Sequence, residues 1–190
     1  MSHWRARRGR AQKFFLGVAM NHGRGVFAFL LILILAAAAR PLGAQNSMAE
    51  QLRQQWAASQ RQMVRIAEAM PADKFHYRPT PEVRSFGEIL NHVAGEGRME
   101  LEAVGGAQLG SPERYESLKE RAEIVRALSE FFEYGTSVLA DMTDQQAVQS
   151  VTLRERQSPR WVVVVGAIGH NKEHFGNLVT YLRLNGLTPP

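Results

Sequence analysis

Two histidines near the C-terminus, His170 and His174, lie four residues apart. On an α-helix this spacing places both imidazoles on one face, about one turn apart, so both can reach the same ion. Imidazole is the commonest metal ligand in proteins, and only four of the six histidines follow residue 44, so chance pairing is uncommon. The alternative is two solvated or core histidines that happen to have this spacing. The pair alone supports both interpretations about equally.

The same five residues fit the pattern His-x-x-Glu-His of the inverted zinc peptidases, with Glu173 as general base. Such a site needs a third ligand, commonly an acid downstream. Residues 175–190 contain no Asp, Glu, His or Cys. The third protein ligand must therefore come from upstream, which weakens the peptidase hypothesis without removing it.

His92 is the upstream candidate for a third ligand. It lies beside apolar residues of another predicted helix, where a lone histidine is more often a core residue. Two facing helices that together offer three histidines are better explained by a shared ion. Three neutral imidazoles leave positions open for water or substrate, as in catalytic metal sites. Imidazole suits zinc, nickel and iron, so the pattern predicts a divalent metal without choosing among them.

Other polar residues near the histidines have more ordinary interpretations. Glu96, one turn after His92, and Glu173, next to His174, could orient an imidazole, but a solvated helix charge is the more usual role for each. His76 lies in a predicted loop and is not expected to be a ligand.

Four amphipathic segments could position these residues. Apolar residues recur at helical steps in residues 47–70, 85–104, 117–141 and 161–184. Ser85 and Glu88 have the spacing of a capping box, which begins the second helix, and two glycines after Val104 end it.

The start of the last segment is ambiguous. Residues 162–165 are four consecutive valines, which alone favour a β-strand. The helical face, however, continues through both C-terminal histidines over about 24 residues, a length that fits a helix. With long connections at residues 71–84 and 143–160, we therefore expect an all-α four-helix bundle with long crossover connections.

Residues 1–44 have the composition of a secretory signal peptide. They hold seven basic residues and no acidic one, residues 26–39 are an unbroken apolar run, and residues 42–44 are a plausible cleavage site. The run is shorter than the roughly 20 apolar residues of a spanning helix, so a cleaved signal is favoured over an N-terminal anchor. The cleavage position and the true start, Met1 or Met20, stay open. The remaining domain, residues 47–190, is expected to be periplasmic or secreted, without stable membrane insertion.

The positive net charge of +5 belongs to this N-terminal segment. Without it, 16 basic residues face 18 acidic ones, so the charge gives no indication of nucleic-acid binding. The chain has no cysteine, which excludes disulfides, thiolate metal ligands and a cysteine nucleophile. Any metal must be held by His, Asp or Glu.

A resemblance to a known family rests on two stretches, FHYRPTPEVRSFGEILNHVAG and AIGHNKEHFGNLVTYLRLNGLTPP. They resemble the DinB-like (DinB/YfiT) family of four-helix-bundle metalloproteins, over roughly residues 48–190. The resemblance implies that His92, His170 and His174 are metal ligands. Relatives include thiol-cofactor transferases and isomerases as well as proteins without known activity. Lys172 departs from the residues common in the second motif and is expected to point away from the metal face.

Together these features predict an exported divalent-metal-binding protein, a metal-dependent hydrolase or transferase that acts on a small-molecule substrate. A homodimer is left open as its assembly. Two alternatives remain: a non-catalytic metal-binding or stress-response helical module, and a zinc peptidase of the His-x-x-Glu-His type. A fourth protein ligand would favour a structural metal, whereas an open cleft would favour chemistry.

Overall fold

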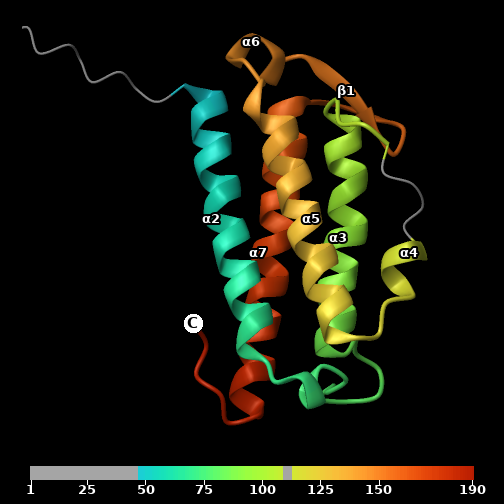
Figure 1. The fold of residues 1–190 in the computed structure, drawn as a ribbon. Helices are drawn as coiled ribbons and strands as arrows, with labels where there is room; N and C mark the ends of the chain where they lie inside the picture. The colour runs from blue at the N-terminus through green and yellow to red at the C-terminus, as the bar shows by residue number, and fades with distance from the viewer. Residues whose placement is uncertain (1–46, 109–112) are drawn as a thin grey trace, which may run out of the picture. The chain divides into compact units, whose positions relative to one another are not determined.

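Four long helices form the bundle, as the ribbon in Figure 1 shows. In chain order they are α2 (Met48–Ala69), α3 (Phe86–Ala103), α5 (Arg121–Ala140) and α7 (Arg160–Leu184). A computed structural model describes residues 47–108 and 113–190, and it confirms the predicted all-α four-helix bundle. None of the helices in these residues combines the length and hydropathy that a bilayer-spanning segment requires. The predicted signal peptide lies outside the described residues.

The packing makes the two histidine-bearing helices neighbours. Helix α3 packs against α5 and α7, and α2 packs against the same two helices. The chain therefore crosses one end of the bundle between α2 and α3, and the opposite end between α5 and α7 (Figure 1). These are the long crossover connections expected from the sequence.

Aromatic side chains fill the centre of the bundle between α2 and α5. The Trp56 ring centroid lies 5.5 Å from that of Phe131 and 5.3 Å from that of Phe132. The Trp56 Nε1–H also donates to the Phe132 carbonyl at 3.1 Å, so the buried indole has its one donor satisfied. The predicted apolar stripe of α2, which includes Leu52 and Ile66, is buried as expected.

The predicted capping box begins α3. The Ser85 Oγ accepts from the Glu88 backbone N–H at 3.3 Å, and the Glu88 carboxylate accepts from the Ser85 N–H at 2.8 Å. These bonds satisfy two amide donors that an uncapped helix leaves without partners. They fix the helix start, so His92 lies in its second turn.

The four valines are helical, as predicted. Val163 and Val164 are buried against the bundle, whereas Val162 and Val165 are exposed. That burial pattern follows helical rather than alternating periodicity, because the helical face established by the later residues of α7 extends through them.

The connection after α5 contains structure that the sequence did not predict. A short helix α6 (Asp144–Ala147) precedes two antiparallel strands, β1 (Ser150–Leu153) and β2 (Arg156–Pro159). Arg154 and Glu155 between the strands have φ values of 48° and 66°. Positive φ at both positions is the geometry of a tight hairpin turn, although neither residue is the glycine or asparagine that usually marks such a turn.

The third long helix begins later than predicted, at Arg121 instead of residue 117. A separate turn of helix, α4 (Glu113–Glu116), comes first, and the Ser117 N–H bonds back to the Glu113 carbonyl at 3.1 Å. The Leu118 carbonyl accepts a hydrogen bond from the buried Asn91 side-chain amide at 3.0 Å. These two bonds hold the segment outside the long helix. A short 3₁₀ turn, η1 (Ala72–Lys74), lies in the first connection.

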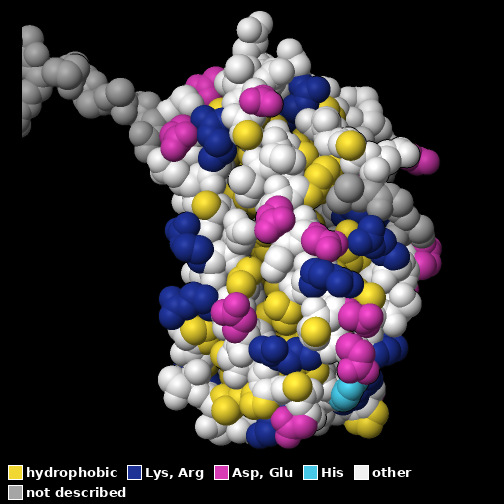
Figure 2. Space-filling model, viewed as in Figure 1, with side chains coloured by type: hydrophobic (Ala, Val, Ile, Leu, Met, Phe, Trp, Pro, Cys, Tyr) yellow, Lys and Arg dark blue, Asp and Glu magenta, His cyan; other side chains and the backbone are white. Residues whose placement is uncertain are grey.

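Charged side chains of both signs share the surface. On the face in Figure 2, Lys and Arg side chains are interspersed with Asp and Glu instead of gathering by sign. Across the described residues this face has no continuous basic surface of the kind that follows a nucleic-acid backbone. The absence of nucleic-acid binding stays a prediction.

One carboxyl group of α3 is unusual in its burial. Burial raises the pKa of Glu100 to about 7, although the charge of Arg154 opposes the shift. Its Oε2 atom is buried without a hydrogen-bond partner among the described residues. The protonated form is therefore favoured up to neutral pH.

This burial predicts a pH-dependent stability. Since the unfolded-state pKa of Glu100 is about 4.5 and the folded one is about 7, the stabilisation is complete below pH 4.5 and is lost as the pH rises through 7. Glu100→Gln stays neutral, so we expect it to be more stable relative to wild type at pH 8 than at pH 4.5. Urea unfolding at both pH values measures this. The exposed Glu133→Gln is the control, and an equal effect of Glu100→Gln at both pH values would contradict the prediction.

Candidate metal centre

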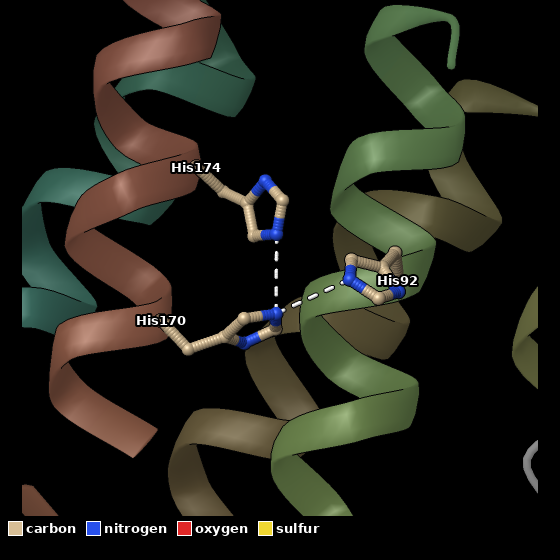
Figure 3. A group of neighbouring side chains, drawn as sticks. All are labelled: His92, His170 and His174. Atoms are coloured by element: carbon tan, nitrogen blue, oxygen red, sulfur yellow. Dashed lines mark hydrogen bonds between the residues drawn. The ribbon is translucent and has the colours of Figure 1, made fainter. Parts of the chain in front are cut away.

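The three histidines singled out from the sequence meet between α3 and α7. His92 comes from α3, and His170 and His174 come from consecutive turns of α7. Figure 3 shows all three rings pointing toward one another across the gap between these helices. The structure thus brings together all three predicted residues, from positions 78 residues apart in the sequence.

The three ring nitrogens cannot all be satisfied by hydrogen bonds to one another. The Nε2 of His170 lies 3.2 Å from the Nε2 of His92 and 3.1 Å from the Nε2 of His174. A ring nitrogen offers either one N–H or one lone pair, so the His170 Nε2 cannot satisfy both neighbours by hydrogen bonding. Nitrogen ligands of a tetrahedral zinc ion lie about 3.3 Å apart, as follows from bonds of 2.0–2.1 Å. The cluster therefore fits a single shared cation.

Burial keeps these imidazoles neutral. It is the main cause that lowers the pKa of His92 and His170, and it lowers the pKa of His174 to about 4. Neighbouring imidazoles and the charge of Arg84 act in the same direction on His174. A metal binds the neutral imidazole, so at neutral pH all three rings are in the form a ligand needs.

A side chain that sequence reasoning missed touches one ring. The amide of Asn177 lies 3.4 Å from the His174 Nδ1. This contact can hold the ring with its Nε2 toward the other two histidines, as second partners of ligand histidines commonly do. Asn177 follows His174 by three residues, a spacing that places neighbours on one helix face, so its position could have been inferred once the ligands were named.

The two acids considered from the sequence do not bond the rings. Glu96 forms an ion pair with Arg154 of the hairpin, and Glu173 is exposed on α7. Both carboxylates act at longer range, where their charge raises the pKa of His92 against the lowering effect of burial. The structure thus favours the solvated-charge interpretation of Glu173.

Two other residues considered from the sequence, His76 and Lys172, are exposed. His76 is exposed in the first connection and takes no part in the cluster. Lys172 is exposed, as expected for a residue that points away from the ring-bearing face.

The cluster has three protein members and is open to solvent. In the described ranges, the group that could hold a metal consists of His92, His170 and His174 alone. A cavity of about 730 Å³ borders it on the side of His174, and one of about 230 Å³ borders it on the side of His92. Three ligands next to open space leave coordination positions for water or substrate, which is typical of catalytic sites.

Three solved structures of Bacillus proteins have a similar fold. A DinB-like protein from Bacillus cereus is similar at 17% identity and a TM-score of 0.67, over 73% of this chain and 93% of that one. A DinB-like protein from Bacillus subtilis is similar at 20% identity and a TM-score of 0.58, over 72% and 92%. YfiT from Bacillus subtilis, described as a probable metal-dependent hydrolase with an unusual four-helix bundle topology, is similar at 12% identity and a TM-score of 0.58, over 73% and 87%. These likenesses confirm the fold.

Sequence comparison identifies the family. No protein with a curated description matches the chain significantly. Residues 44–190 match the sequence model of the DinB family. Because that match includes more than half of the sequence and both histidine-bearing helices, the chain belongs to the DinB family.

Proposed function

We propose that this chain is an exported metal-dependent enzyme of the hydrolase or transferase type, with one divalent ion held by His92, His170 and His174. The observation that carries the proposal is the convergence of three Nε2 atoms from two helices beside open cavities. The description of YfiT as a probable metal-dependent hydrolase supports hydrolysis as the first reaction to test.

The chemistry would be divided between the ion and the chain. When bound, a divalent cation supplies Lewis-acid chemistry that polarises a carbonyl or phosphoryl group and acidifies a water. The three histidines would hold the ion through Nε2 in their neutral form, and Asn177 would orient the ring of His174. The cavity beside His174 offers a small molecule a place to bind. Zinc, nickel and iron all suit these ligands.

A structural or peptidase role has less support. A structural zinc site usually has four protein ligands, whereas this group has three among the described residues. The peptidase hypothesis needs Glu173 as a base at the metal, and its carboxylate is exposed without a bond to any of the three rings.

Export remains part of the proposal. It is supported by the basic and apolar composition of residues 1–44. N-terminal sequencing of protein that is recovered outside the cytoplasm tests export. An intact residue 1–44 segment on protein found only in the cytoplasm would contradict it.

The catalytic proposal is tested by a substrate panel of carboxylic esters, amides and phosphoesters. We expect metal-loaded protein to hydrolyse at least one class, activity to disappear on chelation, and zinc, nickel or iron to restore it. A strict requirement for an added thiol would indicate a transferase. His170→Ala should lose the activity. The control is His76→Ala, which changes an exposed histidine outside the cluster and should keep it. Activity that survives chelation, or no turnover by metal-loaded protein on the whole panel, would contradict the proposal.

A further inference from the structure

Arg84 lines both cavities that border the three histidines. In the larger cavity it lies with His174, Asn177 and Ile89, and in the smaller one with His92. Arg84 directly precedes the serine that caps α3. A molecule in either cavity could therefore contact this arginine and the histidine cluster together.

The Arg84 guanidinium has no partner of its own. It makes no ion pair or hydrogen bond with any residue in the described ranges. The nearest acids in sequence are engaged: Glu88 pairs with Arg78 at 2.9 Å, and the pKa of Glu82 is held down by a hydrogen bond from Thr80. The cation is thus free to bind an anion from solution.

The backbone holds Arg84 at this place. The Tyr181 hydroxyl of α7 donates to the Arg84 carbonyl at 2.8 Å. Arg84 thus lines the cavities next to His174 and His92. After burial, which is the main cause, its positive charge also lowers the pKa of all three histidines. A divalent cation at those rings and this guanidinium repel each other, and an anionic group between them removes that cost.

The remaining wall of the larger cavity has an apolar part and a polar part. The apolar part consists of Pro79, Val83, Ile89 and Tyr181, and the polar part consists of Thr80 and Glu82. The exposed fraction of Val83 is 40%, which is high for a large apolar side chain. An apolar ligand body would cover these side chains and gain from their burial.

We propose that Arg84 binds the oxyanion group, a carboxylate or a phosphate, of a largely apolar small-molecule substrate whose reacting group lies at the three-histidine site. The proposal rests on the proposed function and names its substrate class. It makes Arg84 a specificity-determining residue, because a neutral analogue of the same shape would leave the guanidinium facing the cation without an anion between them.

Binding of matched probes tests the inference without any assay of activity. Zinc-loaded protein is titrated by calorimetry with 3-phenylpropionate, 2-phenylethylphosphonate and the neutral 3-phenylpropionamide. We expect at least one acid to bind about 10-fold more tightly than the amide or better, since hydrogen bonds to charged groups are the stronger class. The two acids distinguish a carboxylate from a phosphate ligand.

The variants assign the preference to Arg84. We expect Arg84→Gln to lower acid affinity by about 10- to 100-fold and leave amide affinity unchanged, and Arg84→Lys to keep part of the preference. Arg65→Gln, an exposed change on α2, is the matched control and should bind as wild type does. Thermal unfolding shows whether each variant is folded, and Arg84→Lys decides the matter if Arg84→Gln is not.

The outcomes separate this inference from the proposed function. Zinc content, measured first, tests the metal site itself. If wild type takes up no zinc, the proposed function fails, and the same titrations on metal-free protein decide whether Arg84 selects acids. Acid binding no tighter than amide binding, or acid affinity equal in Arg84→Gln and wild type, would overturn the inference.

Discussion

Replacing His92, His170 and His174 together by alanine should reduce the metal content of the purified protein from about one ion per chain to none. The reason is that the three Nε2 atoms, within 4.8 Å of one another, form the only group in the described residues with metal-ligand geometry. A single replacement should weaken metal binding by more than the 10- to 100-fold that is lost when a residue that hydrogen-bonds a metal ligand is removed. Elemental analysis after metal reconstitution and desalting measures both effects.

Metal binding should also increase the stability of the folded protein. A ligand that binds only the folded state adds about 4 kcal/mol at a free concentration 1,000 times its Kd, so added zinc should raise the Tm of wild type and leave the triple variant unchanged. His76→Ala keeps the cluster and should respond as wild type does. Full metal content in the triple variant would show that other groups hold the ion, and a wild type that takes up no metal would remove the site.

The candidate site could be predicted because its information is largely local. The four-residue spacing of His170 and His174 fixes their common helix face, and the Ser85 capping box fixes the start of the helix that carries His92. The apolar stripes then determine which faces turn inward, and the valines at the start of α7 follow that face against their own β-propensity. The meeting of α3 with α7 is not local, and its prediction rests on the residue types and on the family resemblance.

What escaped prediction has no recognisable signal in the local sequence. The hairpin at β1 and β2 lacks the glycine or asparagine of a usual tight turn. Leu118 has helical spacing, but its carbonyl accepts a hydrogen bond from Asn91 of α3. The position of Arg84 in the cavities beside His92 and His174 arises from the first crossover connection and the bond from Tyr181. None of these pairings leaves a periodic pattern in the sequence.

Replacing Gly135 by alanine should be the most damaging small change in the core. A Cβ added there would lie 2.1 Å from the Trp56 Cζ2 atom and 2.5 Å from its Cε2 atom. Trp56 is 1% exposed and its Nε1–H is bonded to the Phe132 carbonyl, so the indole can move only by breaking that bond or displacing its neighbours. Overpacking of this kind costs about 1–3 kcal/mol or more, and we expect the Tm of metal-free protein to fall by roughly 5–10 °C.

Gly176→Ala in α7 is the matched control for this prediction. A Cβ there would meet no atom within 4 Å, so the better helix propensity of alanine should raise stability by up to about 1 kcal/mol. A double-mutant cycle locates the strain. In Trp56→Phe the smaller ring leaves room for the new methyl group, so Gly135→Ala should cost much less in that background, and the two changes should be strongly non-additive. Equal costs in both backgrounds would show that Trp56 is not what excludes a side chain at position 135, and that α2 and α5 are not held at their close approach by this glycine.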